Sequence, residues 1–433
     1  MTYILPAGLY EIDPQTGLVV PNSFHWVENS PISPWRALVE VTNGVASQGV
    51  IFALLFIMGG LIYVVIESCA INNVINYSVY KLQDKSITVL VPAIVVLMSA
   101  IGALAGQDSL VTFVLVGLLL VKKLRLDKIA ALSIFYLSYI TGQAAGPTVA
   151  IILMAQETAG LAPISGLGAR LVVWAALTLL CVIYTTRYCL KISKDPSRSI
   201  LGCVEEPDGN DELNKSIPVL GTKDIVTALC MLVPFAFYAY GAAAYAWGFP
   251  NLIAFAMVAV IVVGIVNRTN PNELAVTFLK GASAMGGICL MIGFAKVVGI
   301  VLTDGKILHT IAYAAVTAIG GLGDAFTASG MFLFTTAINL LIPSGPAKVP
   351  MLIPLFVPVA DVLGITRQVM CLAFQLGDGL TNFVTPVSAV LAAALSMSGV
   401  DLRQWWRYVL PYTGITFIIA IVALTILQST GWS

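Results

Sequence analysis

The sequence predicts an all-α polytopic membrane protein, built as an inverted structural repeat with two re-entrant hairpins and two discontinuous helices. Hydrophobic residues make up 58% of its 433 residues and charged residues 10%, and the mean hydropathy is +0.93. In soluble proteins about a quarter of the residues are charged, so this composition excludes a soluble globule. The 22 Lys and Arg balance the 22 Asp and Glu, which leaves no basic patch for nucleic acid.

The cysteines and histidines give no indication of a metal or redox site. The seven cysteines are scattered, form no Cys-x-x-Cys pair and mostly lie in apolar stretches, where they serve as small packing residues. Neither His25 nor His309 has a second ligand at metal-binding spacing. We therefore expect no metal and no cofactor.

The first part of the chain alternates polar segments with apolar segments of spanning length. Residues 1–10 resemble the end of a spanning helix whose body is missing, so we expect a truncated first helix. The polar stretch 11–40 contains one basic residue, Arg36, and residues 49–66 are apolar over nearly the ~20 residues that cross a bilayer. Because basic residues mark the cytoplasmic side, the polar stretch should face outward.

Residues 86–122 form the first expected re-entrant hairpin. Apolar segments 87–104 and 110–121 flank a break at Ala105-Gly-Gln-Asp-Ser109. Basic residues stand before and after the pair, at Lys81, Lys85, Lys122, Lys123, Arg125 and Lys128. Positive charge at both ends places both ends on the cytoplasmic side, with Gln107 and Asp108 at the tip. The alternative is two full spans with Asp108 in an outer loop.

A discontinuous helix is expected next. Its apolar pieces, 126–142 and 147–159, are each short for a span and are separated by Gly142-Gln-Ala-Ala-Gly-Pro147. Further spans are expected at 170–188, 225–247, 252–266 and 287–302. The predicted organisation is a first repeat at 1–190, a cytoplasmic linker at 191–222, connecting scaffold helices at 223–270 and a second repeat at 271–433.

Landmarks of the first half recur in the second half at a constant separation. The same number of residues separates Gly106 from Gly345 and Pro147 from Pro386, and it also relates Gln143 to Asn382. These positions carry a hairpin break and a mid-helix break in each half. The agreement in their order predicts an internal repeat.

The two copies of the repeat have opposite orientations in the membrane. The span at 49–66 runs inward, whereas its counterpart at 287–302 runs outward. The second hairpin, with its tip around Ser344-Gly345-Pro346, therefore enters from outside. The two tips then approach near the midplane, which is the geometry of secondary transporters built from inverted halves.

Charged residues at membrane depth are expensive and therefore informative. The expected ones are Asp108, Lys296, Lys348 and Asp378. Asp378 lies between Gly377 and Gly379 in a segment that we expect to be unwound, where it either binds a ligand or acts as a structural cap or ion-pair partner. Lys296 either neutralises an aspartate or contacts substrate. Lys348 is a second lysine whose ammonium could reach the outer surface.

Uncharged polar residues accompany both breaks. They are Gln107, Ser109, Gln143 and Thr148 in the first half, and Ser344, Asn382, Thr385 and Ser388 in the second. Amides and hydroxyls beside half-helix ends can donate to a carboxylate or accept from Na⁺ and ammonium groups. Polarity alone therefore leaves the sign of the substrate open.

Several motifs of the second half carry a family resemblance. Ile342-Pro-Ser-Gly345, Pro354-Leu-Phe-Val-Pro-Val-Ala-Asp361, Gly364-Ile-Thr-Arg-Gln368 and Ala373-Phe-Gln-Leu-Gly-Asp-Gly-Leu-Thr-Asn382 resemble the YfcC-like family, also labelled anaerobic four-carbon dicarboxylate carriers, of the ion transporter superfamily. The resemblance implies a scaffold and a transport domain, homodimers, and ion-coupled movement of organic anions or exchange of basic amino acids. It also implies that Ser344, Gly345, Gly377, Asp378, Thr381 and Asn382 line the site.

The first half departs from the pattern of that family. Gln107-Asp108 stands where two adjacent acidic residues are usual, and Gly146-Pro147 stands where Asn-Pro is usual. These departures leave both the coupling ion and the substrate open.

The sequence favours a secondary active transporter of the bacterial cytoplasmic (inner) membrane that moves a small carboxylate, either a dicarboxylate or an amino acid, coupled to Na⁺ or H⁺. The candidate substrate- and ion-binding residues are Gln107, Asp108, Ser109, Gln143, Thr148, Lys296, Ser344, Gly345, Gly377, Asp378, Thr381, Asn382 and Thr385. A basic amino-acid antiporter is the alternative, and an ion channel is the alternative from another class.

The expected partners are a small charged metabolite, the lipid bilayer and a second copy of the chain. The sequence contains no phosphate-binding Gly-x-x-x-x-Gly-Lys-Ser/Thr loop, no nucleophile elbow and no His-Glu-x-x-His motif. We therefore expect neither an ATP-driven pump nor an enzyme.

Overall fold

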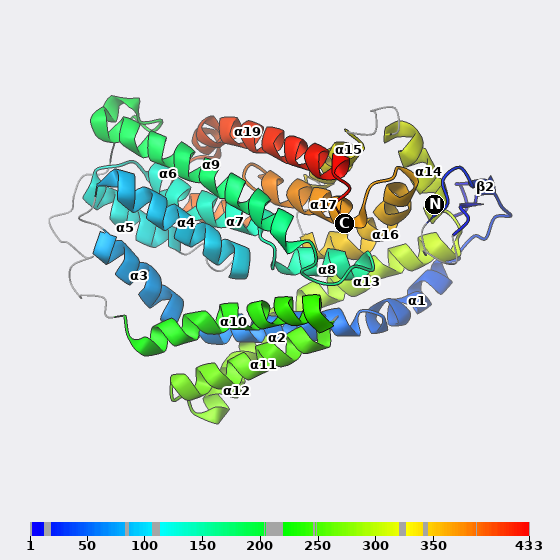
Figure 1. The fold of residues 1–433 in the computed structure, drawn as a ribbon, viewed down its shortest axis with the longest axis horizontal. Coiled ribbons are helices and arrows are strands. Elements are labelled where there is room, and N and C mark those ends of the chain that lie inside the picture. Colours follow the sequence, from blue (N-terminus) through cyan, green and yellow to red (C-terminus); the bar gives the residue numbers. More distant parts are fainter. Residues whose placement is uncertain are drawn as a thin grey trace.

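The computed structural model consists of helices and one short pair of strands (Figure 1). The described residues are 2–12, 19–82, 86–105, 113–202, 204, 220–245, 247, 249–319, 326–340, 345–386 and 388–432. Among them, 7 helical segments are long and apolar enough to cross a membrane, or 8 if one bent pair counts as a span. The predicted all-α polytopic class is confirmed.

The N-terminal residues form a β-hairpin, so the expected end of a spanning helix at 1–10 is wrong. Strand β1 (Gly8–Leu9) pairs antiparallel with β2 (His25–Trp26). The backbone N–H of Gly8 donates to the carbonyl of Lys306 at 3.0 Å, and a Cβ at Gly8 would lie 2.3 Å from the ring of Phe24. The proline at position 6 lacks a backbone donor, which further disfavours a helix in this apolar stretch.

The helices of the first half lie close to the predicted segments. They are α1 (Pro34–Ala46), α2 (Gly49–Glu67), α3 (Ala70–Leu82), α4 (Ile87–Ala105), α5 (Val114–Leu124), α6 (Lys128–Ala131), the π-helix η2 (Leu132–Leu137), α7 (Ser138–Ala145), α8 (Ala150–Thr158), α9 (Leu167–Lys194) and the 3₁₀ turn η3 (Pro196–Arg198). Helix α1 is an addition to the predicted elements. It begins at Pro34, and the N-cap Ser33 side chain accepts from the backbone of Arg36 at 3.2 Å.

The break in the first discontinuous helix lies at 146–149, a few residues later than predicted. Gly142 belongs to α7, where a Cβ would lie 1.9 Å from the carbonyl oxygen of Ser99 in α4. This glycine therefore permits two helices to touch and does not end one.

The remaining helices include the predicted spans. They are α10 (Thr222–Tyr245), α11 (Phe249–Val266), α12 (Pro271–Ala284), α13 (Gly286–Asp304), α14 (Leu308–Ile319), α15 (Thr327–Asn339), α16 (Gly345–Val362), α17 (Arg367–Thr381), α18 (Ala389–Ser398) and α19 (Leu402–Ser429). Helices α12, α14 and α19 are additions to the predicted elements.

Helix α17 continues through Asp378, so the expected unwound segment around Gly377 and Gly379 is wrong. The helix ends at Thr381, and the break lies between it and α18. A Cβ at Gly377 would lie 2.6 Å from the carbonyl oxygen of Phe332 in α15, and one at Gly379 would lie 2.4 Å from the Cα of Ala144 in α7. The two glycines let α17 cross two other helices at backbone distance.

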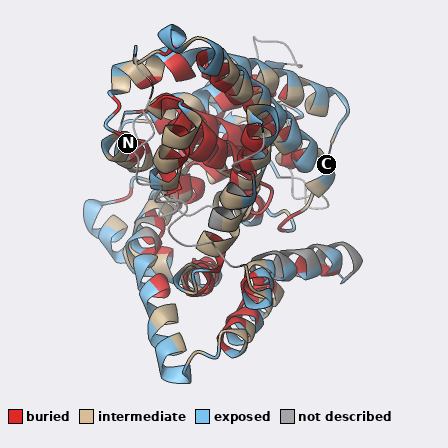
Figure 2. Cartoon of the chain, turned by 90° about the vertical axis from the view of Figure 1, so that its left-hand side faces the viewer, coloured by how far each residue is buried: buried red, intermediate tan, exposed pale blue. Residues whose placement is uncertain are grey.

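The two broken helices occupy the interior of the protein. In the 18-residue apolar window of each span, the buried share of residues is 89% for Lys128–Thr158 but 28% for α9 and 33% for α19. Helix α7 packs against α17, α4 packs against α7, and α15 packs against α17. The long helices α9 and α19 lie along the upper side of Figure 1, whereas α10, α11 and α12 lie along the lower side with α2. Figure 2 shows that the buried residues are concentrated in the upper part of the molecule.

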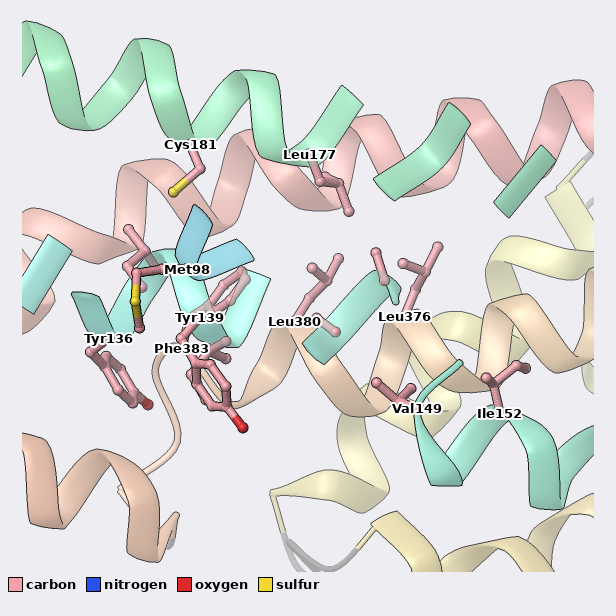
Figure 3. Close-up of a cluster of buried hydrophobic side chains, with 14 of the residues drawn as sticks. Met98, Tyr136, Tyr139, Val149, Ile152, Leu177, Cys181, Leu376, Leu380 and Phe383 are labelled. Carbon is pink, nitrogen blue, oxygen red and sulfur yellow. The ribbon is translucent and has the colours of Figure 1, made fainter. Parts of the chain in front are cut away.

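Apolar side chains from both halves meet around the crossing of α7 and α17 (Figure 3). The labelled members come from α4, η2, α7, α8, α9 and α17 and its end: Met98, Tyr136, Tyr139, Val149, Ile152, Leu177, Cys181, Leu376, Leu380 and Phe383, all buried. Burial of this many side chains holds the two breaks together.

The loops gather at the two ends of α9. At its first end, Val19 N–H donates to Asp361 at 3.3 Å and the Arg367 side chain donates to the carbonyl of Ala159 at 3.0 Å. At its last end, Ser199 Oγ donates to Asp127 at 2.7 Å. The second end carries the basic residues that mark the expected cytoplasmic side: Lys122, Lys123, Arg125, Lys128, Lys191, Lys194 and Arg198.

The close approach at Gly377 and Gly379 yields a stability prediction. Gly377→Ala and Gly379→Ala each force backbone or side-chain displacement, and overpacking of this kind costs about 1–3 kcal/mol. We expect both variants to unfold at lower temperature than the wild type in detergent. Gly414→Ala in α19 is the control, because a Cβ there meets no atom within 4 Å. Wild-type melting of both α17 variants would contradict the described helix crossing.

Candidate functional site

The centre of the candidate site is a buried ion pair between Lys348 and Asp378. The ammonium of Lys348, in the first turn of α16, contacts Oδ1 of Asp378, in the last turn of α17. The exposed side-chain fraction is 0% for the lysine and 9% for the aspartate. The idea that Lys348 extends to the outer surface is therefore wrong. When two opposite charges are buried in this way, the loss of either one leaves the other unpaired and strongly destabilises the protein.

Asn339 joins the pair to the neighbouring helices. Its Oδ1 accepts a hydrogen bond from Lys348 Nζ, while its Nδ2 donates to the backbone carbonyl of Asp378 at 2.8 Å and to Oδ1 of Asn382 at 3.1 Å. Asn339 is the last residue of α15, so one amide ties together α15, the start of α16 and the end of α17. The sequence predictions did not include it, although an amide in an otherwise apolar run is a usable signal.

Gly345 brings the start of α16 against the carboxylate. A Cβ at this position would lie 2.8 Å from Oδ2 of Asp378 and 2.5 Å from Cδ1 of Ile151 in α8. Only a residue without a side chain lets the helix begin here, and a helix N-terminus stabilises a negative charge. Ser344 precedes it and lies outside the described residues.

The predicted residues of the first half lie around the break between α7 and α8. Thr148 donates from Oγ1 to the carbonyl of Ala103 at 2.9 Å, near the end of α4, and a Cβ at Gly146 would lie 2.6 Å from the Cα of Ala103. Gln143 is half-buried on α7. Gln107, Asp108 and Ser109, at the tip of the first hairpin, lie outside the described residues.

Each helix break is held by a side chain from the opposite half. Tyr136 in η2 donates from its hydroxyl to the carbonyl of Asn382 at 3.1 Å, and Gln375 in α17 donates from Nε2 to the carbonyl of Gly146 at 2.7 Å. Tyr136 and Gln375 are separated by the same number of residues as Gly106 and Gly345. Equivalent side chains of the two halves therefore donate to the two breaks, and both donors are absent from the predicted site.

The structure shows the surroundings of four other predicted residues. Gly377 faces α15, and the hydroxyl of Thr381 donates to the carbonyl of Gly377 at 2.6 Å, which commits it to its own helix. Lys296 is half-buried on α13 and forms no ion pair with any described residue, and the partner of Asp378 is Lys348 instead. Thr385 is buried, and its hydroxyl has no hydrogen-bond partner within the described part of the chain.

One cavity lies far from these residues in the fold. It has a volume of about 750 Å³ and lies between α11 and α12, where it is lined by residues such as Ile261, Arg268 and Phe278. None of the predicted site residues lines it. The candidate site is thus the polar interior between the two broken helices and not this peripheral groove.

Comparison with known structures supports the fold. The chain is similar to the YdaH transporter of Alcanivorax borkumensis, with a TM-score of 0.70, 17% identity, and coverage of 100% of this chain and 96% of that one. It is also similar to MtrF of Neisseria gonorrhoeae, whose structure is described as illuminating a class of antimetabolite efflux pumps, with a TM-score of 0.67, 16% identity, and coverage of 98% and 90%. Both likenesses extend over nearly the whole fold.

Comparison with known sequences gives the family. The chain is 29% identical to an Escherichia coli (strain K12) protein provisionally named basic amino acid antiporter YfcC, over 100% of this chain and 94% of the relative. It is 24% identical to an uncharacterized protein of Haemophilus influenzae (strain ATCC 51907 / DSM 11121 / KW20 / Rd), over 94% and 81%. The family model described as C4-dicarboxylate anaerobic carrier matches residues 8–429. The chain therefore belongs to the C4-dicarboxylate anaerobic carrier family, a family of membrane transporters.

Proposed function

We propose that this protein is a secondary active transporter that moves a small carboxylate across the bacterial cytoplasmic membrane by alternating access, coupled to Na⁺ or H⁺. The observation that carries the proposal is the buried Lys348–Asp378 pair, which lies beside the point where the two broken helices meet. Charges at such depth are retained where they bind a ligand or an ion. The lipid bilayer and a second copy of the chain complete the proposed assembly.

The proposed coupling follows from the chemistry of the pair. While Asp378 is ionised, Lys348 is held by it and by Asn339. A proton on Asp378, or a Na⁺ beside it, neutralises the carboxylate and frees the ammonium for a substrate carboxylate. Asn382 Oδ1 and the hydroxyl of Thr385, which has no hydrogen-bond partner among the described residues, are oxygen ligands of the kind that Na⁺ takes. Substrate binding and cation binding then favour each other.

The proposed inverted repeat is supported by the order and packing of the helices. The series α4, α5, α6–η2–α7, α8, α9 corresponds to α15, α16, α17, α18, α19. Helix α5 packs against α18, and in the reciprocal relation α16 packs against α8. Tyr136 and Gln375, which occupy equivalent positions in the two halves, likewise each donate a hydrogen bond to the break of the opposite half. This relation between residues 1–190 and 271–433 is the one expected of two halves that can alternate around a shared site.

The proposed re-entrant hairpins are supported by helix length. In each hairpin one arm is short: α5 has 11 described residues and α15 has 13, whereas the other arms, α4 with 19 and α16 with 18, are long enough to cross a bilayer. Val114 and Asn339, the described ends of the short arms nearest the tips, are buried in protein, where polar backbone is tolerated.

A basic amino-acid antiporter is the second candidate. The name of the Escherichia coli relative suggests it, and one contact favours it: Asp378 already holds a lysine ammonium, which is the group that a basic amino acid would present. In that case the substrate would displace Lys348. An ion channel is the candidate of another class, and dependence of uptake on an ion gradient would exclude it.

Transport assays in liposomes test the ion pair. We expect Lys348→Gln to reduce uptake of labelled succinate at least tenfold, and to destabilise the protein by about 3–5 kcal/mol because Asp378 is left unpaired. The double variant Lys348→Met/Asp378→Leu should regain most of that stability, since it removes both charges, but should not regain transport. Arg403→Gln, at an exposed position on α19, is the control.

Two results would contradict the proposal. Wild-type succinate uptake by the double variant would show that the pair is purely structural. Exchange of arginine or ornithine that depends on Asp378, in a protein that does not move succinate, would assign the antiporter function instead.

Cysteine labelling tests the two sides of the membrane. In a variant without the seven native cysteines, Glu28→Cys near β2 and Lys194→Cys at the end of α9 place single thiols at exposed positions. In intact cells an impermeant maleimide should label Glu28→Cys at once and Lys194→Cys only after permeabilisation. Labelling of both from the same side would overturn the proposed orientation.

A further inference from the structure

Arg170 is a buried cation that has no anionic partner within the part of the chain that the structure describes. It lies in the first turn of α9 and is 0% exposed. Its guanidinium donates to neutral oxygens: Gln368 Oε1 at 2.9 Å, and Gln368 O, Gln375 Oε1 and Ser165 O, each at 3.4 Å. Among the described residues, no carboxylate lies within ion-pair distance of it. A guanidinium in this position is fixed in direction but not neutralised.

The indole ring of Trp432 covers the guanidinium. The ring centre lies 5.3 Å from Cζ of Arg170, and the ring also packs against Gly166, whose φ of +67° and close contact of 2.4 Å exclude a side chain. The indole gives cation–π stabilisation. It provides no negative charge, so no acidic group of the described residues compensates the charge on Arg170.

Gln375 connects Arg170 to the candidate site. Its Oε1 accepts from Arg170 Nη1, while its Nε2 donates to the carbonyl of Gly146 in the break of the first half. Asp378 follows one helical turn later on α17. The side chain of Gln375 therefore links the guanidinium to the break between α7 and α8. Gln375 itself lies one turn of α17 before Asp378, the anionic member of the ion pair.

We propose that Arg170, together with the amide of Gln375, is the subsite that binds a carboxylate of the transported substrate. This inference rests on the proposed function. The guanidinium presents a planar fork that matches the two oxygens of a carboxylate. The carboxylate of the substrate would replace the long contact of 3.4 Å between Arg170 Nη1 and Gln375 Oε1. Because Lys348 and Asp378 neutralise each other, Arg170 is the cation that attracts the anionic group before the coupling cation binds.

The charge arrangement also explains why this costly residue is retained. Burial of a charge without a counter-charge removes its hydration, and this loss destabilises the empty protein. Sites of function commonly keep such groups at the expense of stability. A ligand that brings a negative charge would offset this loss of stability. Much of its binding free energy would then come from its contact with Arg170.

Thermal unfolding of the detergent-purified protein tests the subsite. The wild type, Arg170→Gln and Arg170→Lys are compared in sodium succinate and in sodium chloride of equal Na⁺ concentration. We expect succinate to raise the wild-type midpoint, and its apparent affinity to fall at least tenfold in both variants. In sodium chloride, Arg170→Gln should unfold at or above the wild-type temperature. A structural arginine predicts the reverse, with a lower midpoint and an unchanged succinate response.

The controls separate this inference from the proposed function. Arg403→Gln should respond to succinate as the wild type does. If the wild type and both Arg170 variants respond equally, Arg170 is not the subsite and the proposed transporter stands. If Arg170→Gln does not fold, the test rests on Arg170→Lys. A succinate-induced rise in its unfolding midpoint equal to that of the wild type would likewise show that Arg170 is not the subsite. If the wild type responds to L-arginine and not to succinate, the proposed carboxylate substrate itself is wrong.

Discussion

The constraint on which the rest of the structure depends is the burial of two opposite charges at the meeting point of broken helices. Inside a protein the attraction between Lys348 and Asp378 is strong, but it barely offsets the loss of hydration, so the geometry around both must be exact. Asn339 supplies that geometry by binding the lysine, the backbone of Asp378 and Asn382 at once. Gly345 completes it by bringing a helix start to the carboxylate.

Broken helices in a membrane require partners for the backbone groups that the breaks release. Here the partners come from the opposite half of the chain: Tyr136 binds the carbonyl of Asn382, and Gln375 binds that of Gly146. Such reciprocity makes each half necessary to the other. Gly379 allows the necessary proximity, since its Cα lies against Ala144 with no space for a side chain. A movement of one half would change both breaks together.

The sequence predicts helices well here because apolar length and flanking charge are local properties. The α2 and α13 bounds differ from the predicted spans by at most two residues. The predictions are wrong where one residue type can serve two different structural roles. Glycines at 377 and 379 read as helix breakers, but they serve helix crossing, which depends on a partner that the sequence does not reveal. Likewise, Lys296 and Lys348 look equivalent in the sequence, and only the packing of α15, α16 and α17 selects Lys348 as the partner of Asp378.

The two substrate classes make opposite demands on this arrangement of charge. Arg170 and Lys348 bring two positive charges to the described site, and Asp378 brings one negative charge. A dibasic amino acid would have to displace Lys348 from Asp378, and even with its own carboxylate paired to Arg170 it would leave two cations, Lys348 and its second cationic group, without a carboxylate among the described residues. A carboxylate instead neutralises the excess at Arg170, and a second carboxylate needs the coupling cation to release Lys348. Under the proposed function, the balance of charge among the described residues favours an anionic substrate that enters with a cation.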